Sequence, residues 1–235
     1  MTVGCIIQAR MGSTRLPGKV LMELDEKNNV LYYVIKQLQH CKFLDKIIVA
    51  TTNQNEDNKI ESFVNNVKIT CFRGDSKDVL DRYYQCAKKF KLNTIVRITG
   101  DNPLIDPTLV DETIKKFTTS NFDYATNAHI RSFPFGTETE VFSFNSLETA
   151  WKNAKTPLER EHVTSYFYNN PKKFQILDIK YIKNISHLRW TVDKIEDLEL
   201  VRKIVSKIKN RPILMNNILE LLENEPNLIK INSDV

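Results

Sequence analysis

Residues 6–19 read Ile6-Ile7-Gln8-Ala9-Arg10-Met11-Gly12-Ser13-Thr14-Arg15-Leu16-Pro17-Gly18-Lys19, and they overlap the end of a predicted buried strand, Val3 to Ile7. The loop after this strand carries two glycines, two arginines and a lysine. Glycines let the backbone approach an anion, free backbone N–H groups point into the concavity, and the cationic side chains neutralise the charge. Because open α/β sheets bind ligands at the carboxyl ends of their strands, the loop predicts a polyphosphate site.

The loop differs from the phosphate loop of ATPases and GTPases. The spacing from Gly12 to Gly18-Lys19 is one residue longer than that pattern, and Val20 stands where a serine or threonine would bind magnesium. The alternative to a phosphate site is a turn-rich connection with solvated basic side chains, because clusters of Gly and Pro commonly form turns. The position directly after the first strand favours the phosphate site.

The composition is that of an ordinary water-soluble globular protein. The 235 residues are 41% hydrophobic and 27% charged, which predicts one domain, 1–235, with an ample core. The net charge is +5, but 34 basic residues are set against 29 acidic residues along the whole length. This balance predicts a local anion pocket and no nucleic-acid partner, since a nucleic-acid surface needs a basic face or stripe.

We expect a cytoplasmic protein with no membrane association. No apolar run approaches the ~18 residues that a membrane helix needs, and the amino terminus leads into the first strand without a basic leader or cleavage site. The four cysteines, at positions 5, 41, 71 and 86, form no C-x-x-C pair. They are expected to be small core or surface residues in a reducing compartment.

Strands and helices alternate along the first half of the chain. Further strands are predicted at Lys46–Thr51, Val67–Phe72 and Thr94–Thr99, and helices at Val30–Leu38, after the polar turn Asn53–Asp57, and from about Asp78 to Phe90. This alternation predicts the α/β class, with a mainly parallel twisted sheet and helices on both faces, as in Rossmann-like proteins.

The pattern changes after residue 120. Strands are predicted at Phe122–Thr126, Glu138–Phe144 and Phe174–Tyr181, interleaved with helices near Leu147–Asn153 and Leu158–Tyr168. These elements predict a small β insertion. Two closing helices, Ile195–Ile208 and Ile213–Leu222, follow.

Two aspartates that follow short apolar segments are candidate magnesium ligands. Asp101 comes after the predicted strand Thr94–Thr99, and Asp193 ends the segment Leu188–Asp193. Magnesium prefers one or two carboxylates together with water and substrate phosphates, so two aspartates from separate strand ends suffice. The alternatives are an Asp-Asn-Pro turn at Asp101 and a helix N-cap at Asp193.

Two further segments are candidate binding elements. Arg73-Gly74-Asp75 ends a predicted strand, and its glycine can admit a nucleobase or ribose close to the backbone; a plain turn is the alternative. Glu138 and Glu140 share one face of a predicted strand, because residues two apart point to the same side. Their carboxylates are suited to sugar hydroxyls; a solvated strand face is the alternative.

His162 follows Glu159-Arg160-Glu161 in a predicted helix. It has no accompanying serine or cysteine nucleophile motif, and a helical histidine bonded to a carboxylate is usually structural. The histidines at positions 40, 129 and 187 show no metal-ligand spacing. We therefore predict neither a covalent nucleophile nor a zinc site.

Five segments, taken in order, resemble the motifs of one family. They are residues 6–21, then Arg73-Gly74-Asp75 with Asp78-Val79-Leu80-Asp81-Arg82-Tyr83, then Arg97-Ile98-Thr99-Gly100-Asp101-Asn102-Pro103-Leu104-Ile105-Asp106-Pro107, then Glu159-Arg160-Glu161-His162-Val163-Thr164, and finally Arg189-Trp190-Thr191-Val192-Asp193. Together they closely resemble the SpsF-like branch of the cytidylyltransferase family, which is associated with spore coat polysaccharide biosynthesis. Relatives of this branch include the CMP-sialic acid and CMP-Kdo synthetases.

The resemblance implies a nucleotidyltransferase with a glycosyltransferase-A-like α/β fold. Such an enzyme joins CTP to an acidic or otherwise activated sugar and releases pyrophosphate, with Mg²⁺ as cofactor. By position, Arg10 and Lys19 would take the phosphates with Arg15 assisting, while Asp101 and Asp193 would hold the metal. The catalytic residues implied are thus Arg10, Lys19 and Asp101.

The resemblance also implies two sets of binding residues. The nucleotide set is Gln8, Ala9, Arg10, Met11, Gly12, Ser13, Arg15, Lys19, Arg73, Gly74, Arg97, Gly100 and Asp101, and the sugar set is Asn127, Gly136, Glu138, Glu140, Glu161 and His162. Residues 125–190 match the region that forms the sugar pocket and a dimer arm in relatives, so a homodimer is expected. Many relatives carry Gly-Leu-Asp-Val-Glu where this chain has Gly136-Thr137-Glu138-Thr139-Glu140, which changes the lining of the sugar pocket.

Three other functions fit the sequence less well. A glycosyltransferase that uses a finished nucleotide sugar often has an Asp-x-Asp metal motif, and this chain has a basic triphosphate-type loop instead. A non-catalytic nucleotide-binding protein has no use for the two metal carboxylates Asp101 and Asp193. A nucleic-acid binder is disfavoured by the even distribution of charge.

Overall fold

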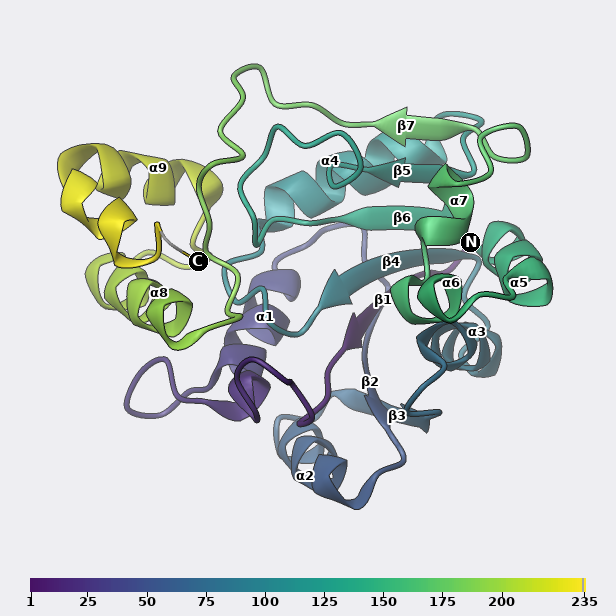
Figure 1. Cartoon of the computed structure of the whole chain (residues 1–235), viewed down its shortest axis with the longest axis horizontal. Helices are drawn as coiled ribbons and strands as arrows, with labels where there is room; N and C mark the ends of the chain where they lie inside the picture. Colours follow the sequence, from purple (N-terminus) through teal and green to yellow (C-terminus); the bar gives the residue numbers. More distant parts are fainter. Residues whose placement is uncertain (234) are drawn as a thin grey trace.

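The computed structural model describes residues 1–233 and 235, and its centre is a seven-stranded sheet (Figure 1). The strand order is β3-β2-β1-β4-β6-β5-β7. The strands are β1 (Val3–Gln8), β2 (Lys46–Thr52), β3 (Thr70–Gly74), β4 (Thr94–Thr99), β5 (Tyr124–Thr126), β6 (Glu140–Ser143) and β7 (Ile176–Asp178). Of these seven, β6 alone runs antiparallel to its neighbours. The prediction of a mainly parallel sheet is confirmed.

Helices cover both faces of the sheet, as predicted (Figure 1). They are α1 (Val30–Leu38), α2 (Asn58–Asn66), α3 (Val79–Lys89), α4 (Pro107–Thr118), α5 (Phe144–Asn153), α6 (Pro157–His162), α7 (Ser165–Tyr168), α8 (Ile195–Lys207) and α9 (Met215–Asn224). Side chains of α1, α2 and α4 pack with Cys5 and Ile7, whereas those of α3, α5 and α7 pack with Ile6. Successive β1 residues thus face opposite layers, as the period of two requires.

A third apolar cluster lies at the carboxyl end of the chain. It centres on the fully buried Trp190 and joins α8 and α9 to the 3-10 helix η3 (Pro226–Ile231). In Figure 1 these helices, coloured yellow-green to yellow, form one end of the molecule. The cluster fixes the segment before α8, which carries Asp193.

Helix α4 is missing from the sequence prediction. Its start signals are present, because Asp106 accepts from the backbone N–H groups of Thr108 and Leu109, and Pro107 stands at the first turn. The second oxygen of Asp106 accepts from the backbone N–H of Met215 at 2.7 Å. The cap therefore also ties α4 to the carboxyl-terminal helices.

Two predicted elements are wrong. The single helix predicted at Leu158–Tyr168 is two short helices, α6 and α7, because Val163 takes a positive φ of 53° that interrupts the helix. The segment Leu188–Asp193 forms only an isolated bridge, Phe135 with Arg189, within the described part of the chain. Its N–H groups are divided between two loops: that of Trp190 donates to Phe135, and that of Val192 donates to Asp101.

Several boundaries are shorter than predicted. Strand β6 begins at Glu140 and not at Glu138, and β5 and β7 have three residues each. Among the described residues, no helix combines the length and apolar character needed to cross a membrane.

Candidate active site

The loop after β1 brings its cationic side chains to the carboxyl edge of the sheet. Gly18 has a left-handed backbone (φ 74°), which suits glycine, and it leads into the 3-10 turn η1 (Lys19–Leu21). The backbone N–H groups of Ser13 and Gly18 both donate to the carbonyl oxygen of Met11, at 2.9 and 2.8 Å. The loop therefore closes on itself, and Lys19 is buried, with 8% of its surface exposed.

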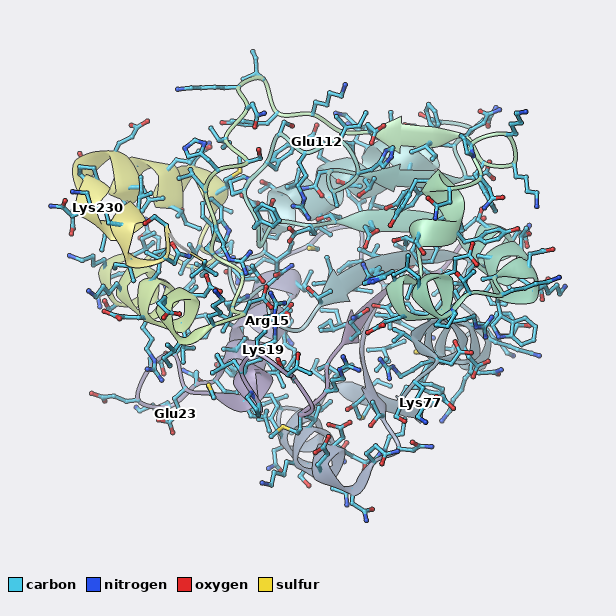
Figure 2. All side chains as sticks on the ribbon, viewed as in Figure 1. Arg15, Lys19, Glu23, Lys77, Glu112 and Lys230 are labelled. Atoms are coloured by element: carbon cyan, nitrogen blue, oxygen red, sulfur yellow. The ribbon has the colours of Figure 1, made fainter. Side chains whose placement is uncertain are left out.

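Lys19 lies between two carboxylates from distant parts of the chain. Its Nζ donates to Asp101 Oδ2 at 2.5 Å and to Asp193 Oδ1 at 2.7 Å. Arg15 Nη2 donates to the same Asp193 oxygen at 2.7 Å, and Figure 2 shows Arg15 and Lys19 close together. The two predicted metal ligands and two of the predicted phosphate-binding cations thus form one cluster.

Asp193 is held by a second layer of charged groups. Arg189 Nη2 donates to Asp193 Oδ2 at 2.6 Å, and Arg189 Nε donates to the fully buried Asp197 at 3.0 Å. Asp197 also accepts from the backbone N–H of Asp193 at 2.9 Å. Burial acts to raise the pKa of Asp193, but its bonds to Lys19 and Arg189 and the charge of Arg15 hold the pKa below its ordinary value. Asp193 is therefore ionised at neutral pH.

The donor set fits a magnesium ion that binds together with phosphates. In the part of the chain that the structure describes, no group of three or more His, Cys, Asp or Glu side chains is placed to hold a metal ion. Asp101 and Asp193 supply two carboxylates, and Mg²⁺ commonly takes its remaining ligands from water and substrate phosphates. Lys19 occupies the space between these carboxylates in the structure.

Two cavities meet at this cluster. The first, of about 290 Å³, follows the loop after β1, and the second, of about 720 Å³, opens between β4, β6 and the segment before α8. Six residues line both cavities: Arg15, Arg97, Thr99, Asp101, His162 and Asp193. We call these six residues the junction.

The two cavities differ in charge. Five cationic side chains line the first cavity against three carboxylates, whereas four arginines line the second against four carboxylates. The cations that line the first cavity and not the second are Arg10, Lys19 and Arg82. An excess of cations suits a polyphosphate, and a balanced wall with many hydrogen-bonding groups suits a polar molecule of low charge.

Glu140 and Glu138 organise the second cavity. Glu140 is buried and accepts from Arg97, from the hydroxyl of Tyr124 at 2.5 Å and from Thr164 at 2.6 Å. Burial and the Glu140 charge both raise the pKa of Tyr124, so its phenol stays protonated. Glu138 accepts from neighbouring groups: Arg131 Nη1 at 2.7 Å, Asn102 Nδ2 at 3.0 Å and the Gly136 backbone at 2.9 Å.

Most of the residues expected from sequence come together at these cavities. The first cavity is bordered by Gln8, Ala9, Arg10, Ser13, Arg15, Lys19, Arg97, Gly100, Asp101, Glu161, His162 and Asp193, and the second includes Glu138 and Glu140. Met11 and Gly12 belong to the same loop but line neither cavity, and Met11 packs against the apolar core. Their roles in binding stay predictions.

Arg73 and Gly74 serve the loops beside the first cavity. The Arg73 guanidinium donates to the carbonyl oxygens of Thr52 and Gln54, at 2.8 and 2.7 Å, and forms an ion pair with Glu61 at 2.7 Å. These bonds connect the ends of β2 and β3 to α2. The structure thus gives Arg73 a local bracing role, and its predicted contact with the nucleotide stays a prediction.

Asn127 and Gly136 support the wall of the second cavity from behind. The buried Asn127 side chain donates to Thr137 O at 2.9 Å and accepts from Thr139 N at 2.8 Å. Gly136 has a φ of 103°, and a Cβ there would lie 2.6 Å from the backbone nitrogen of Thr191. Both residues shape the turn before β6, so their predicted contact with a sugar would be indirect.

Three arginines that the sequence does not predict as site residues line the two cavities. Arg82 lines the first cavity, and Arg131 and Arg189 line the second. Arg82 and Arg189 stand within two of the five family-like segments, which was the available signal. Arg131 has no such signal, because the turn before β6 brings it to Glu138.

Comparison with known proteins decides the family. A family model described as cytidylyltransferase matches residues 4–225. The chain belongs to the cytidylyltransferase family. This membership makes the protein a nucleotidyltransferase, as the five segments implied.

Relatives of this cytidylyltransferase cover nearly its whole length. An uncharacterized protein of Methanocaldococcus jannaschii is 41% identical over 233 residues, 98% of this chain and 94% of that protein. The spore coat polysaccharide biosynthesis protein SpsF of Bacillus subtilis is 33% identical over 229 residues, 94% of each chain. The solved structure of a cytidylyltransferase from Leptospira borgpetersenii superposes with a TM-score of 0.94 at 33% identity and covers 97% of both chains.

Proposed function

We propose that this cytidylyltransferase transfers the cytidylyl group of CTP to a hydroxyl of an acidic sugar, with Mg²⁺, giving a CMP-sugar and pyrophosphate for a surface polysaccharide or glycan. The observation that carries the proposal is the position of Lys19, bonded to both Asp101 and Asp193 where the two cavities meet. A phosphate at that point can be reached from both cavities.

The first cavity suits the triphosphate. Its cationic excess comes from the loop after β1, from β4 and from α3. The loop after β1 supplies both Arg10 and Lys19 to the wall of this cavity. These features support CTP as the donor, and the base follows from the family.

The second cavity suits the sugar. Glu138 and Glu140 offer acceptors to hydroxyls, Tyr168 adds an aromatic surface, and His162 lies at the junction. Arg131 stacks 3.9 Å from the ring centroid of Phe135, and about a third of its side chain remains exposed. A partly exposed guanidinium, paired with Glu138 at 2.7 Å, is available to a carboxylate and supports an acidic sugar, in line with the resemblance to CMP-sialic acid and CMP-Kdo synthetases.

Transfer at the junction requires mainly positioning and electrostatics. The sugar hydroxyl attacks the α-phosphorus in line with the departing pyrophosphate. The bond from the α-phosphorus to the sugar oxygen forms as its bond to the bridging oxygen of pyrophosphate breaks, and the hydroxyl proton passes to water. Lys19 and Arg10 stabilise the developing charge, and the second cavity orients the hydroxyl. When bound by Asp101 and Asp193, Mg²⁺ would neutralise phosphate charge. This route uses no covalent nucleophile.

We also propose a cytoplasmic homodimer that pairs through residues 125–190. Three large apolar side chains of this region face outward: Ile130 at 45%, Leu158 at 60% and Ile182 at 100% exposure. Apolar groups at such positions favour a protein partner. Sedimentation would test this part of the proposal: the mass of a dimer supports it, and a monomer at micromolar concentration contradicts it.

Pyrophosphate release tests the proposed function. The protein is incubated with CTP, ATP, GTP or UTP, with Mg²⁺ or EDTA, and with acidic sugars such as Kdo-like and nonulosonic acids beside neutral sugars. Release that needs CTP, Mg²⁺ and one acidic sugar supports the proposal. Release with another triphosphate or with a neutral sugar alone contradicts the substrate assignment.

A further inference from the structure

Arg82 is a buried cation in the wall of the first cavity. It lies one turn into α3 and is 2% exposed. Its Nη1 donates to the carbonyl oxygen of Asp75 at 2.8 Å, while its Nε has no hydrogen-bond partner within residues 1–233 and 235. Across the same residues, no carboxylate lies within 4.0 Å of its guanidinium. A buried guanidinium in this state is costly unless a ligand supplies the missing charge.

The nearby carboxylates are occupied elsewhere. Asp57 accepts from the backbone of Met11 and from Thr52, and Asp75 accepts from the backbones of Lys77 and Asp78. Their charges attract the Arg82 guanidinium only from beyond ion-pair distance. Neither aspartate satisfies the buried cation.

A second arginine increases the positive charge. Arg10 lines the same cavity, and its nearest carboxylate contact, Glu161, is 4.0 Å away between two half-exposed side chains. Burial lowers the pKa of Arg82, and the charge of Arg10 lowers it further. Two guanidinium groups that repel one another across a cavity form a site for an anion.

The chain makes room for Arg82 at Gly74. A Cβ on Gly74 would lie 2.9 Å from Arg82 Cγ and 3.0 Å from Phe72 Cε1. The glycine that ends β3 therefore permits the Arg82 side chain to pass the strand. This explains the glycine without a direct contact between Gly74 and the nucleotide.

The location of Arg82 determines which phosphates of CTP its side chain can contact. Arg10 and Arg82 line the first cavity and not the second, whereas the transferred α-phosphate must lie at the junction to be reached by the acceptor. We infer that Arg82, together with Arg10, binds the two phosphates that are not transferred, the β- and γ-phosphates of CTP, and hence the pyrophosphate that is released. The inference rests on the proposed function.

Calorimetry with three ligands tests this assignment. CTP, inorganic pyrophosphate and CMP are titrated into the wild-type protein, Arg82→Met, Arg82→Lys and the control Lys77→Met, which removes an exposed cation that Figure 2 shows away from Lys19. For Arg82→Met we expect the affinity for CTP and pyrophosphate to fall about tenfold to a hundredfold, the range for hydrogen bonds to charged groups, with CMP affinity unchanged. Arg82→Lys should show a smaller loss, and Lys77→Met none.

Thermal unfolding separates binding from structure. Without ligand, Arg82→Met should have a melting temperature no lower than that of the wild type, because an unpaired buried charge is removed. Pyrophosphate should raise the melting temperature of the wild type but not that of Arg82→Met. Unchanged pyrophosphate affinity in Arg82→Met, or an equal loss for CMP, overturns the assignment. If Arg82→Met does not fold, Arg82→Lys decides by the same comparison. Wild-type protein that binds neither CTP nor pyrophosphate overturns the proposed function itself.

Discussion

The ammonium group of Lys19 lies 2.7 Å from the carboxylate of Asp193, although the two residues are 174 positions apart in the chain. The same ammonium lies 2.5 Å from Asp101. The loop after β1 thus places a cation between the two proposed metal ligands, and a metal bound by both carboxylates would have to displace Lys19.

Lys19→Met should lose activity and yet bind a divalent metal more tightly. Removing the cation frees both carboxylates, so the affinity for Mn²⁺ without nucleotide should rise by at least tenfold, while the transfer rate falls ~10² to 10³-fold. Mn²⁺ titration followed by electron paramagnetic resonance measures the first effect. Lys27→Met, which removes an exposed lysine, is the control. Weaker Mn²⁺ binding in Lys19→Met would show that Lys19 does not compete for this site.

Asp101→Asn should keep the fold and lose at least ~10²-fold in turnover, the typical cost of losing one key electrostatic partner. The neutral amide has the shape of the carboxylate but not its charge. Steady-state rates and circular dichroism measure both properties. Glu112→Gln, an exposed change on α4, serves as the matched control. A full-rate Asp101→Asn enzyme would exclude Asp101 from the chemistry.

Glu138→Gln should weaken the binding of the sugar and leave the binding of CTP unchanged. Glu138 lines only the second cavity and bonds to Arg131 and Asn102. We expect the KM for the sugar to rise about tenfold, as for loss of a hydrogen bond to a charged group, with CTP affinity unchanged. Separate titrations of the two substrates measure this. An equal effect on both substrates would argue against separate sites.

The folded protein should become less stable at acidic pH because Asp193 and Asp197 become protonated. Burial acts to raise the pKa of each carboxyl, but hydrogen bonds hold both pKa values below the ordinary value of 3.8. The Asp193 carboxylate accepts from Lys19 and Arg189. The Asp197 carboxylate accepts from Arg189 and Asn232. A pKa lowered on folding adds stability above that ordinary value, and this stability is lost as the pH falls through the folded pKa. The free energy of unfolding should therefore decrease below about pH 4.

Urea unfolding from pH 7 to pH 3 measures this dependence. Asp193→Asn should be less stable than the wild type at pH 7 and should show a shallower decrease below pH 4, since one contributing group is absent. The same slope in both proteins would show that Asp193 has no lowered pKa in the folded state.

The first part of the fold follows from the sequence because its central strands, β1, β2 and β4, are short and mainly buried apolar runs. Arg10, Lys19 and Asp101 could be placed together, since the carboxyl ends of parallel strands β1 and β4 meet at one edge. Asp193 reaches the same edge for a different reason. Its segment is not a strand. Backbone hydrogen bonds to Phe135 and Asp101, two residues that are distant in the sequence, hold this segment in place.

Other parts depend on tertiary contacts that a local pattern does not contain. Arg82 lies on the buried face of α3, three residues after Val79, and the local pattern does not show that the space beside Gly74 admits its side chain. Val163 interrupts a sequence with helical spacing. Asn127 follows β5, and its side chain bonds to the backbones of Thr137 and Thr139, so it supports the wall of the second cavity without lining it.

The most direct test of the account follows the phosphorus atoms. CTP labelled at the α-phosphate and, separately, at the γ-phosphate is incubated with the protein, Mg²⁺ and the sugar panel, and the products are separated. The account predicts that the α-label enters a sugar product while the γ-label leaves as pyrophosphate. Transfer of the γ-label to the sugar, or release of pyrophosphate without α-labelled sugar, would contradict it.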